Sequence, residues 1–291
     1  MSAPGAQPER FPARWASDWG EDPYGLWQAF TYLGLRQGLR WIPPGRFRMG
    51  SPVGEQDRDE HECPHEVILT RGFWLAETAC TQALWQAVMG ENPSQFTGGQ
   101  APVERVNWDD AQRFIGRLNT LVNSLDGDRP PGRPAAPRSL DLEFRLPTEA
   151  EWERACRAGT TTPFSCGEDL DPAQANYDGN HPYRGGDKGL YRARTVEVAT
   201  LPANPWGLYE MHGNVWEWCQ DWYGDYPAGP VTDPVGPATG AWRVLRGASW
   251  VDQGRGLRCA YRGRDDPGVR NPNLGLRLAL GPQPRSELTG G

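Results

Sequence analysis

Paired cysteines and long apolar runs are missing from this chain of 291 residues. The cysteines are scattered and no two form a CxxC pair, which argues against a disulfide framework and favours buried free thiols. There is no apolar run of the length needed to span a membrane. The segment Met1–Arg10 also lacks the basic and apolar regions of an export signal. We therefore expect a soluble, cytoplasmic protein without membrane insertion.

Basic residues are outnumbered, and Lys188 is the only lysine. The net charge of −7 argues against a general nucleic-acid-binding surface. Aromatic residues are plentiful, with 14 Trp, 9 Tyr and 8 Phe, and each can bury a large apolar area. Together with 36 Gly and 28 Pro, this composition predicts one β-rich domain with an aromatic core and many turns.

The N-terminal part is predicted to be an arm followed by a short helix, over residues 1–40. Residues 1–22 are polar and rich in proline, and residues 24–40 have the pattern of an amphipathic helix. Strands are expected over 41–49 and 67–75, where apolar residues follow turn signals.

Three further helices are predicted from capping signals. The first starts after the N-cap Thr81 and ends at Gly90, and the second starts at about Asn107. The third follows Thr148, where Glu151 completes a capping box. Residues 126–139 form a Pro/Arg-rich insertion loop, and residues 282–291 form a C-terminal tail.

Eight segments carry a resemblance to a known family. The chain resembles the sulfatase-modifying-factor family, which includes the formylglycine-generating enzyme and the C-terminal domain of ergothioneine-type sulfoxide synthases. The resemblance covers about residues 41–281 and implies an α+β, irregular C-type-lectin-like fold with little regular secondary structure. The segments are FRMGS (47–51), HEV (65–67), WQAVMGENPSQF (85–96), PVERVNWDDAQRF (102–114), RLPTEAEWERACRAGT (145–160), NPWGLYEMHGNVWEWCQDWY (204–223), RVLRGASW (243–250) and LGLRLA (274–279).

The catalytic cysteine pair of the formylglycine-generating enzyme is missing. In the family, the pair follows a GGS(Y/W) motif and binds copper(I), but residues 249–257 contain no cysteine here. Cys259 lies beyond that stretch and has no partner within it. The resemblance therefore implies the fold without the activity, and we expect neither an enzyme nor a copper site.

An iron site of the sulfoxide-synthase kind is not expected either. That site uses three histidines, and a separate helical domain contributes to it. This chain has only four histidines in all, and its N-terminal segment is too short for such a domain. His61, Cys63 and His65 alternate and could form a soft metal site on one face of a strand. The sequence favours a simpler interpretation, in which these residues belong to a polar surface loop, and it leaves the metal site as the alternative.

Structural calcium is the cofactor that the resemblance implies. The family binds calcium through the loop that contains GNVWEW, and oxygen ligands suit this cation. Carried over, one site would use Glu217 with the backbone oxygens of His212, Gly213 and Val215. A second site would use Asn176, Tyr177 and Asp187, although the spacing there departs from the family.

Residues 245–277 also resemble the variable region of a diversity-generating-retroelement target protein. In such proteins, adenine mutagenesis randomises selected AAY codons on a fixed frame, here RVLRG-SW, LR-A-R-R and LGLR. In extended backbone, alternate residues would place a fixed arginine face opposite a changeable face. The candidate variable positions are Val251, Asp252, Gly256, Cys259, Tyr261, Gly263, Asp265, Asp266, Val269, Asn271, Pro272 and Asn273.

This interpretation predicts a ligand-binding protein whose C-terminal surface recognises another protein or macromolecule. Two alternatives stay open. The chain could be a diverged nonheme-metal or formylglycine-generating-type oxidase, or a non-catalytic accessory domain attached to signalling or surface machinery. In both, the alternating arginines would simply pack and pair with acidic residues.

Overall fold

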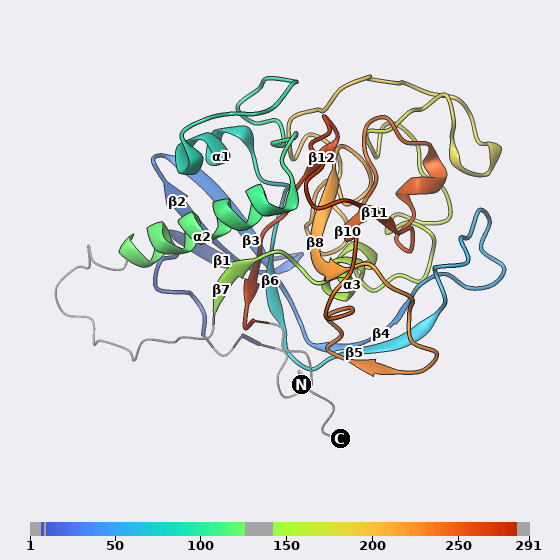
Figure 1. The fold of residues 1–291 in the computed structure, drawn as a ribbon, viewed down its shortest axis with the longest axis horizontal. Coiled ribbons are helices and arrows are strands. Elements are labelled where there is room, and N and C mark those ends of the chain that lie inside the picture. The colour runs from blue at the N-terminus through green and yellow to red at the C-terminus, as the bar shows by residue number, and fades with distance from the viewer. Residues whose placement is uncertain (1–6, 9, 126–141, 284–291) are drawn as a thin grey trace.

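The computed structural model describes residues 7, 8, 10–125 and 142–283. The insertion loop predicted over 126–139 and most of the tail predicted over 282–291 lie outside these residues. Within them, strands and irregular segments dominate, as predicted, and helices are few (Figure 1). No helix in the described part of the chain is both long enough and apolar enough to cross a bilayer.

The N-terminal segment is a β-meander, so the helix predicted over 24–40 is wrong. Three antiparallel strands replace it: β1 (Asp18–Asp22), β2 (Gly25–Tyr32) and β3 (Leu35–Ile42). The turn between β2 and β3 is Leu33–Gly34, and both residues have positive φ. That geometry is the one that joins two strands tightly, and it overrides the helical spacing of the apolar residues.

These strands form one side of a six-stranded sheet in the order β1-β2-β3-β6-β13-β7. The added strands come from distant parts of the chain: β6 (Phe73–Ala76), β7 (Glu143–Arg145) and β13 (Ala279–Gly281). Neighbouring residues of β6 point into different cores, with Trp74 on one face and Leu75 on the other. Apolar side chains therefore cover both faces of this sheet, as the two-residue period of a strand requires.

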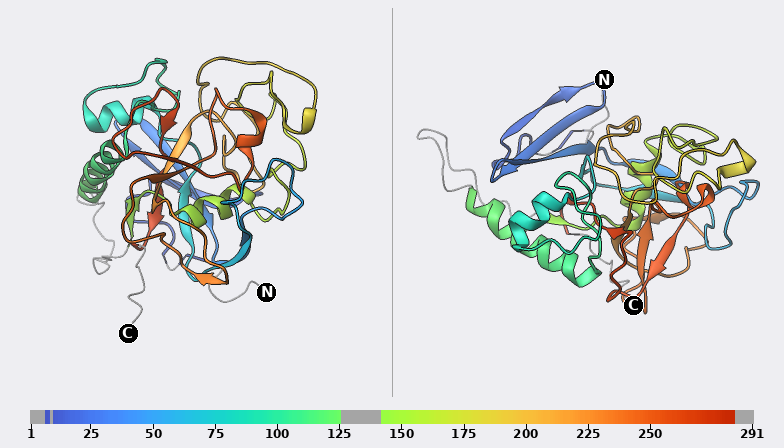
Figure 2. Two further views of the ribbon diagram at one scale, coloured as in Figure 1. Left: turned by 45° about the vertical axis from the view of Figure 1, so that its right-hand side comes forward. Right: turned by 90° about the horizontal axis from the view of Figure 1, so that it is seen from above.

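Two helices cover the first face of the sheet (Figure 2). These are α1 (Gln82–Met89), capped by Thr81 and Gly90 as predicted, and α2 (Trp108–Leu125). Phe114 of α2 stacks on Trp85 of α1, with ring centroids 4.9 Å apart. The helices predicted from Thr81 and Asn107 are thus confirmed.

On the other side lies α3 (Glu149–Arg157), which packs against β4 (Gly45–Met49), β8 (Trp216–Trp222) and β10 (Arg243–Arg246). Thr148 and Glu151 form the predicted capping box. Trp152, Ala155 and Cys156 are buried, as predicted from their spacing.

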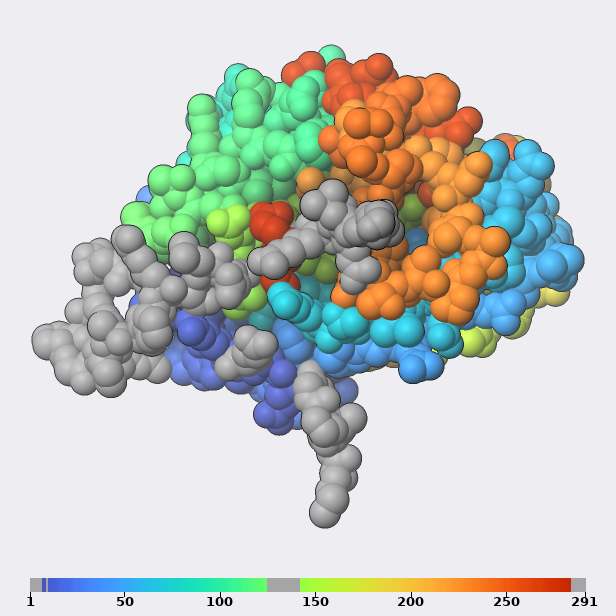
Figure 3. Space-filling view, turned by 60° about the horizontal axis from the view of Figure 1, so that its bottom comes forward, coloured from blue at the N-terminus to red at the C-terminus, as the bar shows by residue number. Residues whose placement is uncertain are grey.

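A three-stranded and a four-stranded sheet complete the fold. The strand predicted over 67–75 is two strands, since β5 ends at Leu69 and β6 begins at Phe73. In Figure 3 the segment that carries β9, in orange, lies directly against the blue and cyan segments of β4 and β5. The smaller sheet contains β4 (Gly45–Met49), β5 (His65–Leu69) and β9 (Val231–Thr232), and the larger contains β8 (Trp216–Trp222), β10 (Arg243–Arg246), β11 (Gly263–Asp265) and β12 (Leu274–Gly275).

Candidate functional site

Three arginines hold the C-terminal segment in the interior. Arg246, Arg258 and Arg277, which we call the arginine frame, have no exposed surface. Each lies in a stretch that the sequence assigned to the fixed part of the segment. A buried guanidinium needs carboxylate and carbonyl partners, and all three arginines have them.

Arg258 ties the segment to a loop nearly two hundred residues earlier. Its guanidinium donates to both carboxylate oxygens of Glu62 at 2.7 Å and to Glu55 at 2.6 Å. The bidentate pair with Glu62 fixes the orientation of the arginine as well as its position.

Arg246 orders the chain on both sides of Cys259. It donates to Glu153 of α3 at 2.5 Å and to the carbonyl oxygens of Cys259 at 2.6 Å and Tyr261 at 2.8 Å. These bonds satisfy backbone oxygens that no strand would otherwise pair. Arg246 therefore anchors the backbone of the irregular stretch around Cys259.

The structure corrects the predicted alternation of a fixed and a changeable face. Arg258, Cys259 and Ala260 are all buried, because this stretch follows the 3₁₀ helix Gly254–Leu257 and is not extended strand. Exposure alternates only at the end, where Arg264 is exposed between its two neighbours in β11. Arginines do pair and stack, as the alternative interpretation predicted: Arg262 binds Glu149 at 2.7 Å.

Ten of the twelve candidate variable positions reach the surface at least in part, and two do not. Gly256 and Cys259 are buried, so their prediction as surface positions is wrong. Cys259 lies inside the core, where it contacts α3. The ten positions are Val251, Asp252, Tyr261, Gly263, Asp265, Asp266, Val269, Asn271, Pro272 and Asn273.

Trp216, a buried residue of β8, contacts the first group of these positions. Its ring lies 6.1 Å from the ring of Tyr261, and its backbone N–H donates to the carbonyl of Asn273 at 2.8 Å. A Cβ on Gly263 would lie 2.7 Å from the Trp216 ring, so a larger residue there must displace the ring. We call Trp216 with Asp252, Tyr261 and Asn273 the Trp216 surface.

Asp252 is the acidic member of the Trp216 surface. Its carboxylate accepts from the hydroxyl of Ser249 at 2.5 Å and from the side chain of Trp216. Burial raises the pKa of Asp252 above its usual value, and these hydrogen bonds oppose the shift. Asn273 donates to the same Ser249 hydroxyl at 3.2 Å, so one network joins both ends of the variable segment.

An aromatic rim, not predicted from the sequence, borders the Trp216 surface. Trp250 donates its indole N–H to the carbonyl of Pro272 and lies 5.3 Å from the ring of Phe96 and 6.4 Å from that of Tyr191. All three rings are partly exposed. Partly exposed aromatic side chains beside polar groups are typical of binding surfaces.

A second group of candidate positions follows β11 and lies against the start of α2. Asp266 accepts the backbone N–H of Val269 in a turn, and Asn271 accepts that of Arg105. Arg270 binds Asp110 of α2 at 2.7 Å. The candidate positions therefore occupy two neighbouring regions and not one continuous strand face.

The first predicted calcium site does not fit the cation at its carboxylate. Glu217 is buried, and Arg277 donates to both of its oxygens at 3.0 Å. Trp152 donates its indole N–H to the same carboxylate at 2.6 Å. A guanidinium thus neutralises the charge that calcium would need. His212, Gly213 and Val215 lie close by in the chain, but their backbone oxygens alone lack that charge.

The second predicted calcium site is only partly assembled. Asn176 is buried, and its side-chain oxygen has no hydrogen-bond partner, as an oxygen ligand would require. Tyr177 is buried beside it, and its hydroxyl donates to the carbonyl of Leu170. Asp187, by contrast, is exposed in a loop, whereas Asn176 and Tyr177 are buried.

Among the described residues, metal-ligand side chains converge at a place that the sequence did not indicate. The soft metal site considered for His61, Cys63 and His65 is wrong, because their ligand atoms do not converge. The His65 ring instead contacts the backbone oxygen of Cys63 at 3.0 Å. The group that does converge is Cys156, His212 and Cys259. No spacing signal could reveal it, because Cys156 and Cys259 are 103 residues apart.

The fold and the sequence together define a member of a known family. The Sulfatase-modifying factor enzyme 1-like domain matches residues 35–281, and the chain belongs to that family. The match begins inside β3, six residues before the predicted start of the domain. It confirms the family, and the C-type-lectin-like α+β fold is confirmed by the structural neighbours below.

Curated relatives include a protein kinase and formylglycine-generating enzymes. The "Serine/threonine-protein kinase pkn1" of Chlamydia caviae is 45% identical over 250 residues, which are 83% of this chain and 37% of that protein. This chain therefore spans little more than a third of the kinase's length. The "Formylglycine-generating enzyme" of Streptomyces coelicolor is 30% identical, over 82% of this chain and 87% of the enzyme.

A variable protein is among the solved structures that this fold resembles. Treponema denticola variable protein 1 superimposes with a TM-score of 0.73 and 32% identity, over 88% of this chain and 99% of that one. PvdO from Pseudomonas aeruginosa has a TM-score of 0.69 at 22% identity, which is a likeness of fold. The resemblance to a variable protein, inferred from the C-terminal segment, is thus supported by the whole fold.

Proposed function

We propose that this chain is the ligand-binding variable protein of a diversity-generating retroelement. The observation that carries the proposal is the division of residues 245–277 into two parts. The arginine frame is fully buried and paired, whereas ten of the candidate variable positions reach the surface in two neighbouring regions. A fold that fixes the backbone while leaving these side chains replaceable is what a variable binding site needs.

The chemistry of the surface favours a macromolecular ligand. The Trp216 surface and its aromatic rim combine rings, an acid and amides, as in the paratopes of antibodies. Such surfaces bind through rigid aromatic anchors and adaptable polar contacts. We therefore propose another protein as the partner, with no nucleic acid and no redox cofactor in recognition, and with any calcium in a structural role.

A display experiment tests the proposal. Nine positions that reach the surface at least in part are randomised with NNY codons, which, like mutagenised AAY codons, exclude Gln, Glu, Lys, Met and Trp. Gly263 is kept because a larger residue there would displace the Trp216 ring. We expect most clones to remain folded, since surface changes usually cost less than about 0.5 kcal/mol. Selection on hen lysozyme should then yield binders. The positions are Val251, Asp252, Tyr261, Asp265, Asp266, Val269, Asn271, Pro272 and Asn273.

The matched control library randomises buried residues of the same segment. NNY codons at Arg246, Leu257, Arg258 and Arg277 should leave few folded clones, because each change leaves a cavity or an unpaired charge. Protease resistance of the displayed clones measures the fraction of folded clones in each library. Equal tolerance of the two libraries, or equal intolerance, contradicts the proposed division of the segment.

We further propose that the chain is not an enzyme. Residues 249–257 form a loop and a 3₁₀ helix with no thiol, so the stretch has no nucleophilic pair. With a cysteine-containing sulfatase peptide and copper(I), we expect no aldehyde above the blank by mass spectrometry. The Streptomyces coelicolor relative serves as the positive control. Measurable turnover by this chain would contradict the proposal.

A second candidate function is an accessory domain within a signalling protein. The likeness to pkn1 favours it, because that kinase is more than twice as long as the matched region. Sequencing the full reading frame that encodes this chain, with its flanking DNA, tests this role. A kinase sequence in the same frame, with no adenine-rich template nearby, would support the accessory role over the variable protein.

A further inference from the structure

Two cysteines and a histidine meet in the core, away from the Trp216 surface. Cys156 of α3 and Cys259 place their sulfur atoms 3.6 Å apart, and both ring nitrogens of His212 lie 3.9 Å from the Cys156 sulfur. One ligand atom from each residue lies within 4.8 Å of the other two, and all three residues are buried. Neither the family resemblance nor the proposed function uses this group.

We propose that Cys156, Cys259 and His212 bind a thiophilic d¹⁰ cation that links α3 to the C-terminal segment. Thiolate and imidazole are the ligands that Cu⁺ and Zn²⁺ prefer. Two sulfurs 3.6 Å apart can both reach the ~2.3 Å metal–sulfur bonding distance, with an angle of about 100° at the metal. The pair therefore needs little movement to become two ligands.

His212 is already in the form that binds a metal. Its Nδ1–H donates to the carbonyl of Leu257 at 2.7 Å, which leaves the lone pair on Nε2. The backbone N–H of Ser165 donates to Nε2 at 3.1 Å, which agrees with a ring that carries no hydrogen on Nε2. The Nε2 atom now accepts from the hydroxyl of Ser165 at 2.8 Å. On binding, the ring turns and exchanges the Ser165 contacts for the metal.

Two guanidinium groups, those of Arg157 and Arg246, lie close enough to the sulfur atoms to act on their charge. Both arginines bind the single carboxylate of Glu153, at 2.8 and 2.5 Å. These three groups carry a net charge of +1. Two thiolates with Cu⁺ carry −1 and balance it, whereas two thiolates with Zn²⁺ carry no charge, so a monovalent cation is favoured.

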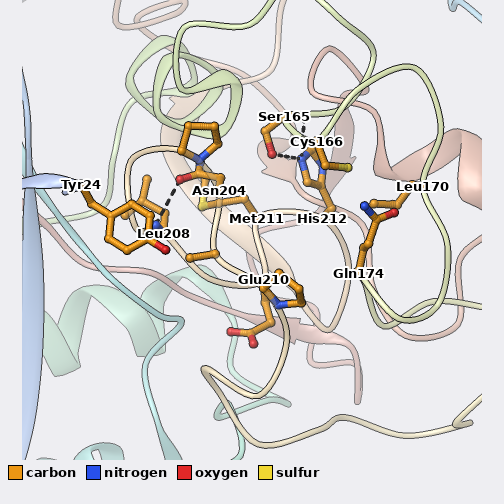
Figure 4. Close-up of a pocket in the computed structure, with 13 residues that line it drawn as sticks. Tyr24, Ser165, Cys166, Leu170, Gln174, Asn204, Leu208, Glu210, Met211 and His212 are labelled. Atoms are coloured by element: carbon orange, nitrogen blue, oxygen red, sulfur yellow. Dashed lines mark hydrogen bonds between the residues drawn. The ribbon is translucent and has the colours of Figure 1, made fainter.

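A pocket gives the cation a route to the site. It has a volume of about 260 Å³ and is lined by His212, Ser165 and Met211 at its inner wall and by Tyr24 and Cys166 towards solvent. Figure 4 shows His212 and Ser165 side by side in that wall, joined by their hydrogen bond. Rotation of the His212 ring would open the wall to the two sulfurs behind it.

This inference differs from the expectation that copper is not bound. That expectation rested on residues 249–257, which contain no cysteine. The thiols proposed here lie outside that stretch and form a closed, structural site without a substrate position. The inference is independent of the proposed ligand-binding function, and either can fail alone.

Metal titration of the full chain tests the site. The protein is purified under reducing, anaerobic conditions, titrated with Cu⁺ or Zn²⁺, desalted and analysed for metal content. We expect about one tightly held equivalent of Cu⁺ and weaker retention of Zn²⁺. The variant C156S/C259S should lose the bound equivalent. The matched control C63S/C166S removes two exposed thiols and should keep it.

Several results would overturn the proposal. These are no retained metal, equal retention by C156S/C259S, or loss of binding in the control variant. A disulfide between Cys156 and Cys259 that persists in the anaerobically reduced protein would also overturn it. If C156S/C259S does not fold, X-ray absorption of the metal-loaded native chain decides. Two sulfur neighbours and one nitrogen support the site, and oxygen or nitrogen neighbours alone refute it.

Discussion

Replacing Arg277 by methionine is expected to lower the free energy of unfolding by about 3–5 kcal/mol, the usual cost of removing one partner of a buried ion pair. Arg277 is completely buried, and it binds both oxygens of Glu217. It also donates to the carbonyl oxygens of Ala76, Glu77 and Tyr209, at 2.9, 2.8 and 2.7 Å. The variant leaves a buried carboxylate without a counter-charge.

Urea unfolding of a double-mutant cycle measures this effect. E217Q removes the charge from the partner, so R277M/E217Q should recover a large part of the loss seen in R277M. R270M is the matched control, since Arg270 is an exposed arginine of the same segment and its partner Asp110 keeps a second arginine, Arg113. The variant should cost less than about 1 kcal/mol. A loss below about 1 kcal/mol in R277M would show that the frame does not hold the segment.

Replacing Asp221 by asparagine is expected to stabilise the protein above neutral pH. Burial and the nearby charge of Glu149 together raise the pKa of Asp221 to about 8. Between about pH 4 and pH 8 the native state therefore keeps a proton that the unfolded state has released. Native stability falls as pH rises through this window, by at most about 1.4 kcal/mol per unit.

The asparagine variant removes this contribution at every pH. Its side-chain oxygen can still accept the backbone N–H of Glu149, which Asp221 accepts at 2.9 Å. The unfolding free energies of the native protein and the variant at pH 4.5, 6, 7 and 8.5 should agree at the acid end. They should diverge by up to about 5–6 kcal/mol at the alkaline end. Parallel pH profiles for the two proteins would mean that Asp221 is ionised in the native state.

Local signals predicted the helices well, because capping depends on residues close together in sequence. Thr81, Thr148 and Gly90 cap the helices that they were expected to cap. The segment 24–40 failed for the opposite reason. Its strands pair with β1 and with β6. The partner β6 lies far along the chain, so this pairing leaves no trace in the local periodicity.

The candidate site was predicted as a set of positions but not as a surface. The arginines of the fixed part were identified, and all three members of the frame are buried. Gly256 and Cys259 were misplaced because the stretch before β11 is irregular and cannot follow a two-residue alternation. The aromatic rim escaped notice because Phe96, Tyr191 and Trp250 come from three separate loops.

The contact between the Cys156 and Cys259 thiols in the core could not be predicted from the sequence either. A search for paired cysteines within a few residues finds none here. The fold brings Cys156 to Cys259 through the packing of α3 against the sheet of β8 and β10. Sequence spacing cannot reveal a contact made across 103 residues without the fold that makes it.

The central claim is that residues 245–277 vary on a fixed frame, and sequencing of their DNA tests it directly. The stretch encoding residues 243–280 is read from many cells of the source population, together with the flanking locus. The account predicts substitutions at the exposed candidate positions, matched by adenines in a nearby template repeat beside a reverse-transcriptase gene. It predicts no substitutions at Arg246, Arg258 or Arg277. An invariant segment with no template repeat would contradict the proposal, and the accessory-domain role would then take its place.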